Sequence, residues 1–596
     1  MVRAMRNRQV VRLFAVLGLV LAACGPGSRD NFGDDDGSNG SGVGSNPGGG
    51  CSSDLHQVTD ANGNVIATCP DDQGCAAGQC VAACDAAAAS QGSVGCDFTV
   101  ATPSFLPNIA PPCFAVFLAN NWPKDAVVTI SRGGTTYDAS QFGRVPNGSP
   151  NAASWPTVPT TGIASSDVGV LFLGNDPTSN NLGNVTACPV PAAVAMTGGS
   201  AVFSGSDSAT GLGTAFHITT SFPVSAYDIQ PYGGASSFLP SAELLLPTTA
   251  WGTNYVTAGP QPTSGAGWGQ ILASQDNTTV TITPKVALPA GTGVAGAPAN
   301  SPTTYTLNAG QYVQWQSAGD MAGSVIQSTN PVSFTDGTTY LCLSNSTSSG
   351  GGCDSGHQLV PPVSALGSEY VAPPYATRRA DLQEESIHYR FVGAADGTTL
   401  TYNPAVPGAP PTINLGQVVE FDATGAFTIN SQDTMHPFYV GQYMTGCEVT
   451  SGSRPGYVID PISMTPCLGD EEYVDILPPA QWLSSYVFFT DPTYTTTNLV
   501  VVRKAGTTGF QDVTVDCLGV IGGWTPVGTS GQYEMTRVDL QRLNPVGSCT
   551  NGRHTASSGG AFTIMVWGLA NFASYAYPAG GNVGKINPVV VIGRQQ

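Results

Sequence analysis

Alternation of apolar and polar residues is the main pattern of this chain beyond residue 100. Runs such as Thr278 to Ile282 (Thr-Thr-Val-Thr-Ile) place an apolar side chain at every second position. They are bounded by Gly, Pro, Asn or Asp, which is the signature of β-strands. Apolar residues spaced as in amphipathic helices are not sustained over any long segment. The pattern therefore predicts an all-β body.

Four sequence phrases recur in the same order along this body. The most regular is a proline-led strand entry, in which a large apolar residue lies four positions before a tyrosine. Its copies begin at Pro247, Pro362 and Pro478, which is a period of about 115 residues and indicates tandem units. The other phrases are a Thr/Val strand after an acidic turn (from Asp125, Asp276, Asp396 and Asp512), a Gly-Gln turn (Gly310-Gln311 and Gly416-Gln417) and a proline-led strand (from Pro223, Pro331 and Pro437).

A unit of this length holds about seven short strands, which is the content of one β-sandwich. We therefore expect tandem β-sandwich-like units of about 105–120 residues. Four are counted, at approximately 97–235, 236–345, 346–446 and 447–596, with the first and last degenerate, as terminal repeats often are. A β-propeller, to which each unit supplies one or two blades, stays open as the alternative because closure would hide strand edges.

The N-terminus carries an export signal. Four arginines precede an apolar run that ends Leu21-Ala22-Ala23-Cys24, and this run is too short for a membrane-spanning helix. Its end resembles the bacterial lipobox, in which the cysteine is acylated and becomes the new N-terminus. We therefore predict a lipoprotein signal peptide over 1–23 and lipid attachment at Cys24, with a plain secretory signal as the alternative.

The segment that follows has the composition of a flexible tether. Residues 24–50 are mostly Gly, Ser, Asn and Asp, so they cannot bury a core. Each acyl methylene buried in a bilayer contributes about 0.8 kcal/mol, so several chains on one cysteine anchor a protein stably. We expect an exported protein held to a membrane by its N-terminal lipid. Gly25 favours the outer membrane and cell surface of a Gram-negative bacterium.

The cysteine count supports this compartment. Fifteen cysteines become an even fourteen once Cys24 is assigned to lipid, and an exported chain favours disulfides. Residues 51–96 are too few to fold on apolar burial alone, and three unassigned disulfides are expected among their cysteines: Cys51, Cys69, Cys75, Cys80, Cys84 and Cys96. The others fall as neighbouring pairs, one in each unit, and predict the disulfides Cys113–Cys188, Cys342–Cys353, Cys447–Cys467 and Cys517–Cys549.

Charge narrows the range of partners. Only 10% of residues are charged and the net charge is −20, which repels phosphate backbones and argues against nucleic-acid binding.

The sequence contains no recognisable catalytic or metal motif. The six histidines stand in no metal-binding motif, and no serine lies in a Gly-x-Ser-x-Gly elbow. The acidic runs Glu384-Glu385 and Asp470-Glu471-Glu472 are expected in solvated loops. No catalytic residue, metal site or cofactor is predicted.

Two further groups have a functional and a structural interpretation. Trp251, Tyr255, Trp268 and Trp315 would suit a sugar-binding platform, but aromatic residues in β-repeats are usually core, and core is the prediction. Cys353, Asp354 and His357 are expected in a Gly-rich loop, Ser348 to Gly356, before a repeat strand. A disulfide-closed hairpin loop is the preferred interpretation of this segment, and a ligand-binding loop is the alternative.

The order of the phrases resembles a known family. Residues 97–596, and most clearly 245–375, resemble the N-terminal domain of the IgGFc-binding protein family, which occurs in a mucus-associated animal protein and in many bacterial surface proteins. The segments that carry the resemblance are Ile271 to Pro284, Leu307 to Gln311, Gly323 to Val332, His357 to Pro362 and Gly367 to Val371. The resemblance implies extracellular binding or adhesion and supplies no catalytic residues.

The combined expectation is a non-catalytic lipoprotein of the cell surface. Its β-rich body would bind extracellular proteins or glycans through loops on a rigid scaffold. A structural component of the envelope or extracellular matrix, without a discrete ligand, is one alternative. An unrecognised extracellular hydrolase is the other.

Overall fold

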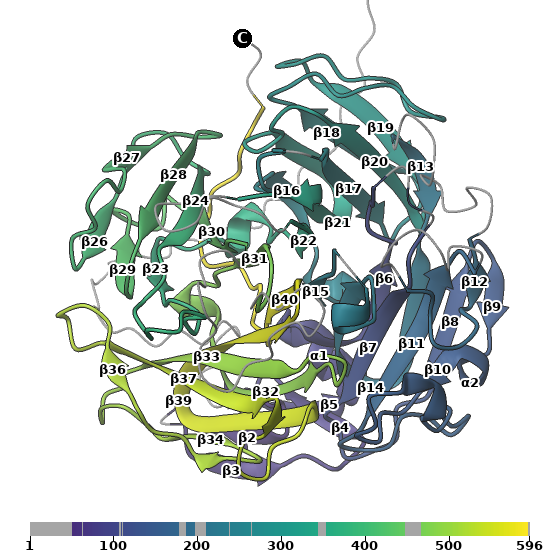
Figure 1. Ribbon diagram of the computed structural model, residues 1–596, viewed down its shortest axis with the longest axis vertical. Coiled ribbons are helices and arrows are strands. Elements are labelled where there is room, and N and C mark those ends of the chain that lie inside the picture. Colours follow the sequence, from purple (N-terminus) through teal and green to yellow (C-terminus); the bar gives the residue numbers. More distant parts are fainter. Residues whose placement is uncertain are drawn as a thin grey trace, which may run out of the picture. The chain divides into compact units, whose positions relative to one another are not determined.

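The computed structural model describes residues 50–593, except 62, 107–108, 110, 178–185, 197–209, 238, 264, 344–352 and 447–466. All of them lie in one compact unit, Gly42–Gln596. The regular secondary structure of the described residues is almost entirely β-strand (Figure 1), which confirms the predicted all-β class. No helix within the described ranges is both long enough and apolar enough to cross a membrane.

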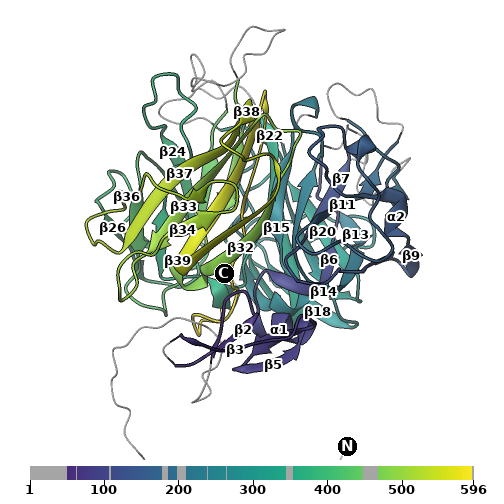
Figure 2. The same ribbon diagram turned by 90° about the horizontal axis from the view of Figure 1, so that it is seen from below.

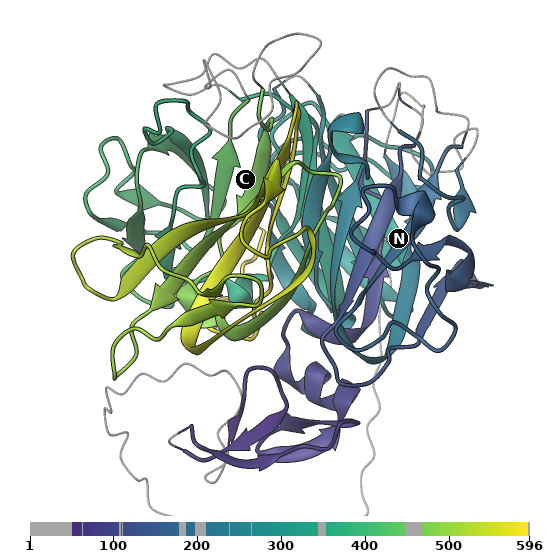
Figure 3. The ribbon, with the colours of Figure 1, turned by 60° about the horizontal axis from the view of Figure 1, so that its bottom comes forward.

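A small disulfide-bonded module comes first. Disulfides join Cys51 to Cys75, Cys69 to Cys80 and Cys84 to Cys96. Its elements are β1 (Gly50–Cys51), β2 (Gln57–Thr59), β3 (Val65–Thr68), β4 (Gln73–Ala76), β5 (Gln79–Ala82) and α1 (Ala83–Ser90) (Figure 3). The module packs against the body through Trp122, whose indole NH donates to the Asp71 carbonyl at 3.0 Å. The three disulfides compensate for the small apolar core of this module.

The first sheet has nine strands in the order β10-β11-β7-β14-β8-β9, with β12 on β11 and both β6 and β15 on β14. Short helices α2 (Ala139–Phe142), η1 (Ala152–Ser154) and η3 (Gly234–Ser236) lie in its connections. Its strands are β6 (Val94–Val100), β7 (Phe114–Asn120), β8 (Val128–Arg132), β9 (Thr135–Tyr137), β10 (Gly143–Arg144), β11 (Val168–Asn175), β12 (Val194–Ala195), β14 (Phe216–Gln230) and β15 (Ser241–Leu245).

The second sheet has eight strands in the order β13-β20-β17-β21-β18-β19, with β16 and β22 on β21. Helix η4 (Thr248–Ala250) leads into it and η5 (Val363–Ala365) leaves it. Its strands are β13 (Gly211–Thr214), β16 (Gly252–Val256), β17 (Gly267–Ala273), β18 (Thr278–Thr283), β19 (Thr303–Leu307), β20 (Gln311–Ser317), β21 (Val325–Leu341) and β22 (Asp354–Leu359).

The third group consists of three small sheets, β23-β29-β26, β28-β24-β30-β31 and β25-β27. Two of them face each other across one apolar core, as in a β-sandwich. Their strands are β23 (Glu369–Ala372), β24 (Ile387–Gly393), β25 (Thr398–Thr399), β26 (Thr401–Asn403), β27 (Thr412–Ile413), β28 (Val418–Ala423), β29 (Phe427–Asn430), β30 (Phe438–Met444) and β31 (Glu472–Asp475).

The fourth sheet has nine strands in the order β35-β34-β39-β33-β37-β36, with β32 and β40 on β39 and β38 on β37. Helix η7 (Pro479–Gln481) leads into it. Its strands are β32 (Leu483–Thr490), β33 (Thr496–Lys504), β34 (Val513–Val515), β35 (Gly519–Val520), β36 (Thr525–Pro526), β37 (Tyr533–Arg542), β38 (Asn544–Pro545), β39 (Gly552–Ala570) and β40 (Ala573–Pro578).

Each group contributes one strand to a central ring. The strands β15, β22, β31 and β40 lie at the centre of Figure 1, and each contacts the next in cyclic order, with β40 returning to β15. In Figure 2, β15 lies in the middle of the view, at the side of the first sheet that faces the fourth sheet. The sheets are curled and sandwich-like, as expected, while the cyclic contact of the inner strands is the feature that the propeller alternative describes.

The proline-led phrase explains how neighbouring groups fit together. In each copy the tyrosine hydroxyl accepts a hydrogen bond from a backbone NH three residues earlier and donates to a backbone carbonyl of a later strand in the same group. For Tyr255 these bonds are 2.9 Å from Gly252 and 2.6 Å to Val332. A Cβ at Gly252 would lie 2.4 Å from the Cβ of Pro362, the proline of the next copy. Only glycine permits this approach.

The strand pairing does not follow the approximate unit boundaries closely. The boundary between 235 and 236 falls before β15, yet β15 pairs with β14 of the first sheet. Strand β13 precedes that boundary and pairs with β20 of the second sheet. Each inner strand therefore pairs with the strand that precedes it in the sequence and belongs to that strand's sheet. Relative to the predicted boundary, β15 belongs to the first sheet and β13 to the second.

Candidate functional site

A polar cleft of about 500 Å³ lies between the first and second sheets. One wall comes from β6, β8 and β14 of the first sheet, and the other comes from β13 and the turns around β17, β19 and β20 of the second. Its lining residues are Asp97, Thr99, Ser131, Arg132, Gly133, Gly134, Thr214, Ala215, His217, Ser274, Asn308, Ala309, Gly310 and Gln311. No large apolar side chain is among them, so the cleft suits a polar ligand.

An aspartate–histidine pair forms one side of the cleft. Asp97 Oδ2 lies 3.1 Å from His217 Nε2, and Asp97 Oδ1 accepts a hydrogen bond from the Thr248 hydroxyl at 2.9 Å. Burial opposes ionisation of Asp97, but the hydrogen bond and charge of His217, with the Thr248 bond, hold its pKa below the usual value. The Asp97 hydrogen bond in turn raises the pKa of His217. The pair is about half exposed and offers a ligand both signs of charge.

Arg132 stands at the end of β8, beside the cleft. The hairpin between β8 and β9 turns on Gly133 and Gly134, both at positive φ, as a two-residue turn requires. The Arg132 Nε donates to the Thr214 carbonyl at 3.0 Å, and the guanidinium lies 5.3 Å from the centre of the Phe216 ring. These contacts hold a cation near the Asp97–His217 pair, where it would attract a carboxylate or hydroxyl group of a ligand.

The opposite wall is the Gly-Gln phrase of the second unit. Gly310 has φ +75°, and the Gln311 side-chain oxygen accepts a hydrogen bond from the Asn308 NH at 2.9 Å. The third unit repeats this turn, where Gln417 accepts from the Asn414 NH at 3.0 Å. The glutamine therefore closes its own turn, and the recurrence of the phrase has a structural cause. In the second unit the same turn also lines the cleft.

The cleft lacks the arrangement of a catalytic nucleophile and base. The described hydrogen bonds of the His217 ring run to Asp97 and to no serine or threonine hydroxyl. A general base must contact the proton that it removes. The arrangement can bind polar groups through charge and hydrogen bonds.

Disulfides join three of the cysteine pairs proposed from spacing: Cys113–Cys188, Cys342–Cys353 and Cys517–Cys549. Cys467 is disulfide-bonded, but its expected partner Cys447 lies outside the described residues. The same holds for Cys24, for the signal peptide over 1–23 and for the tether up to residue 49. Lipid attachment at Cys24 therefore stays a prediction.

The aromatic candidates are core residues, as predicted. Trp251, Tyr255, Trp268 and Trp315 are all buried. The prediction for the acidic runs was wrong in part, since Glu385 and the run Asp470-Glu471-Glu472 are buried. Glu385 is neutralised by the buried Arg378 at 2.7 Å, and Glu472 begins the inner strand β31. Neither environment is visible from the local sequence.

Two groups of side chains in the described ranges have the composition of a metal site. One is Asp516, Cys517 and His554, but Cys517 is consumed by its disulfide to Cys549. The other is Asp228, Glu243 and His357, all buried, with their ligand atoms within 4.8 Å of one another. Asp354 and His357 both lie on β22, so the expectation that they stand in a loop was wrong; the strand begins at Asp354, directly after Cys353.

Sequence reasoning did not find the cleft. Asp97, Arg132 and His217 come from three strands of one sheet, and Asn308 and Gln311 come from another sheet. The one available signal was the Gly-Gln phrase, which marked a repeated turn without indicating what faces it.

Comparison with known proteins identifies relatives of the body. A sequence model of the family described as "IgGFc binding protein" matches residues 241–568. The human IgGFc-binding protein is 26% identical over 356 residues, which cover 58% of this chain. The match spans 6% of the human protein's length. No solved structure matches.

Proposed function

Because the chain belongs to the IgGFc-binding protein family, we propose that it is a non-catalytic binding protein for an extracellular protein or glycan. The match of the family model over residues 241–568 carries this proposal. That range includes β15 of the first sheet, the second sheet apart from β13, the third group and most of the fourth sheet. The binding of immunoglobulin Fc that the human relative's name describes is one candidate among extracellular protein ligands.

The cleft between the first and second sheets is the proposed ligand site. Its carboxylate, imidazole, guanidinium and amide groups offer both donors and acceptors. A hydroxyl-rich glycan or a polar protein loop matches this lining better than an apolar ligand does. The rigid β scaffold on both sides holds these groups in place before the ligand arrives, which lowers the entropic cost of binding.

We further propose that the protein is exported and anchored through a lipid on Cys24, with the body displayed at the cell surface. The support is the lipobox-like end of the N-terminal apolar run and the Gly/Ser/Asp-rich residues 24–50. The disulfides of the body are consistent with an oxidising compartment.

Binding is tested with the mature chain in detergent, applied to an array of glycans, mucins, matrix proteins and IgG Fc. We expect a signal that weakens at least tenfold in the double variant Asp97→Asn, Arg132→Ala, because both charges at the cleft are lost. Arg144→Ala is the matched control, since Arg144 lies in the same sheet outside the cleft lining. Equal binding by the double variant would move the ligand away from the cleft. Silence of the wild type across the array would favour the structural envelope role.

Anchoring is tested by growing cells with labelled fatty acid. Wild type is expected to incorporate label and fractionate with the outer membrane, and Cys24→Ala is expected to lose both. Equal labelling of the two proteins would end the anchoring proposal and leave the plain secretory signal.

A further inference from the structure

Three buried titratable residues meet where the first and second sheets join at the central ring. Asp228 lies on β14 and Glu243 lies directly opposite it on the neighbouring strand β15. His357 lies on β22, the inner strand of the second sheet, which packs against β15. The three side chains therefore come from two sheets and from positions far apart in the sequence.

The geometry of this group fits a bound ion. His357 Nε2 lies 2.9 Å from Asp228 Oδ1, a hydrogen-bonding distance. Adjacent ligands of a tetrahedral ion with bonds of about 2.0–2.2 Å lie about 3.3–3.6 Å apart, so the pair would open by about half an ångström to admit the ion. All three ligand atoms lie within 4.8 Å of one another. Asp228, Glu243 and His357 are 0%, 3% and 1% exposed, so water does not solvate their charges.

Two oxygen atoms of the group have no hydrogen-bond partner in the described structure. They are Asp228 Oδ2 and Glu243 Oε2, each almost inaccessible to solvent. A buried carboxylate oxygen without a partner costs several kcal/mol unless a cation or a proton neutralises it. The group therefore requires positive charge that the described side chains do not supply in full.

We propose that Asp228, Glu243 and His357 bind one divalent transition-metal ion, of the Zn²⁺ type, at the junction of the first and second sheets. The mixed imidazole and carboxylate donor set suits Zn²⁺, whereas Ca²⁺ takes oxygen ligands alone. The ion would neutralise both carboxylates and would join β14, β15 and β22 at the ring. The rival is a proton shared between the two carboxyl groups.

Metal content distinguishes the two. The full-length protein is purified without added metal, and the metal bound to it is measured by inductively coupled plasma mass spectrometry. We then refold the protein from denaturant with and without Zn²⁺, because the site is enclosed in the folded chain. We expect close to one equivalent of metal per chain, a higher midpoint of unfolding with Zn²⁺ than without, and X-ray absorption showing nitrogen and oxygen ligands.

Variants assign the ligands. His357→Gln and the near-isosteric Glu243→Gln are each expected to reduce bound metal at least tenfold and to abolish the effect of Zn²⁺ on refolding. His554→Gln, in the group whose cysteine is disulfide-bonded, is the control and is expected to keep one equivalent. If the variants do not fold, the metal content and the Zn²⁺-dependent refolding of the wild-type protein still test the proposal. Wild-type protein that binds no metal and refolds identically with and without Zn²⁺ would overturn the proposal in favour of the shared proton.

Discussion

His388 on β24 lies beside two carboxylates of the neighbouring strand β28, Glu420 and Asp422. Its Nδ1 lies 2.9 Å from Asp422 Oδ1, and its Nε2 lies 3.9 Å from Glu420 Oε1. Burial acts to lower the pKa of His388, but the two carboxylates outweigh burial and raise it to about 9. Arg390 also contacts Glu420, so a small network of alternating charges crosses β24 and β28.

This network predicts a pH dependence of stability. Because the folded pKa of His388 exceeds its usual 6.5, its stabilising charge is complete below that pH and is lost as pH rises through about 9. The loss is on the order of 3 kcal/mol. Urea unfolding at a series of pH values from 6 to 10 should show this decline in wild type and a flatter profile in His388→Gln. An unchanged profile in the variant would contradict the assignment, and His436→Gln serves as the matched control.

At the scale of elements, the proline-led phrase is the unit that the sequence predicted best. The turn and the hydrogen bond from its backbone NH to the tyrosine lie within a few residues, so the sequence pattern marks them directly. The approach of the glycine to the next proline spans a whole repeat and is indicated only by the recurrence of the phrase. Tyr370 repeats the arrangement of Tyr255, accepting from the Gly367 NH at 2.8 Å and donating to the Phe438 carbonyl. Tyr486 repeats it again with Leu483 and Phe562.

Substituting phenylalanine for the tyrosine of the proline-led phrase tests its two hydrogen bonds. Tyr370→Phe removes two buried hydrogen bonds and leaves an amide and a carbonyl unpaired, so we expect a loss of roughly 1–3 kcal/mol in the free energy of unfolding. Tyr255→Phe and Tyr486→Phe should cost similar amounts. Tyr402→Phe removes a single bond, to Pro410 at 2.7 Å, from a less buried ring and should cost less. Equal losses of unfolding free energy at Tyr370 and Tyr402 would show that the paired hydrogen bonds of the proline-led phrase add nothing to stability.

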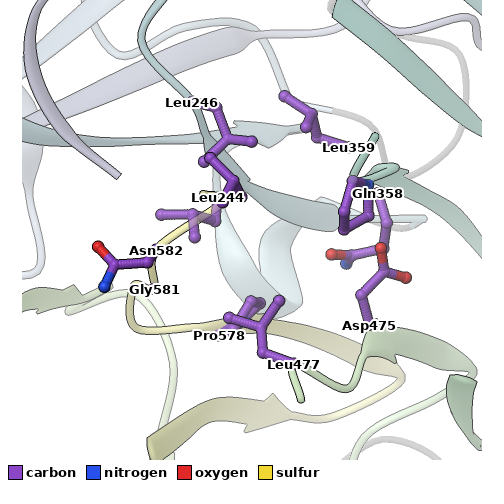
Figure 4. Close-up of a pocket in the computed structure, with 11 residues that line it drawn as sticks. Leu244, Leu246, Gln358, Leu359, Asp475, Leu477, Pro578, Gly581 and Asn582 are labelled. Carbon is purple, nitrogen blue, oxygen red and sulfur yellow. The ribbon is translucent and has the colours of Figure 1, made fainter. Parts of the chain in front are cut away.

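At the scale of the whole molecule, the polar centre is what the sequence did not predict. The side chain of Gln358 on β22 donates to the carbonyls of Ala242, Tyr473 and Ala576 at 3.0, 3.0 and 3.2 Å. One amide therefore contacts all three other inner strands. A void of only about 20 Å³ lies beside it, lined by Leu244, Leu359 and Asp475 among others (Figure 4). No local pattern indicates these partners, because each comes from a different repeat.

Gln358→Leu tests the ring. The substitution preserves approximate volume but leaves three buried carbonyls without this donor, so we expect a loss of roughly 2–4 kcal/mol in unfolding free energy. Gln141→Leu, on the exposed side of α2, is the control and should change stability by less than about 0.5 kcal/mol. Denaturant unfolding of both variants is the measurement, and similar midpoints for the two would show that the ring does not depend on Gln358.

The segment after β40 forms hydrogen bonds with several parts of the chain that are distant in sequence. The backbone NH of Val583 donates to the Gln91 carbonyl and that of Asn582 to the Gln481 carbonyl, both at 2.9 Å. The Asn587 side chain donates to the carbonyls of Val363 and Leu366. Val591 and Asn254 exchange two hydrogen bonds. One segment after β40 thus reaches the end of the N-terminal module, η7, η5 and β16.

Closure of the ring by β40 and this segment has a consequence for the order of events during synthesis. The inner strand β15 ends at Leu245, and its neighbour β40 begins at Ala573, so nearly the whole body must exist before the first sheet gains its last partner. Pairing across such a separation in sequence is slow. The growing chain therefore carries an open ring until β40 and the segment after it have emerged. A chain released before β40 is made would have separate sheets whose inner strands lack a neighbour. Intermediates that expose such apolar surface are prone to aggregate.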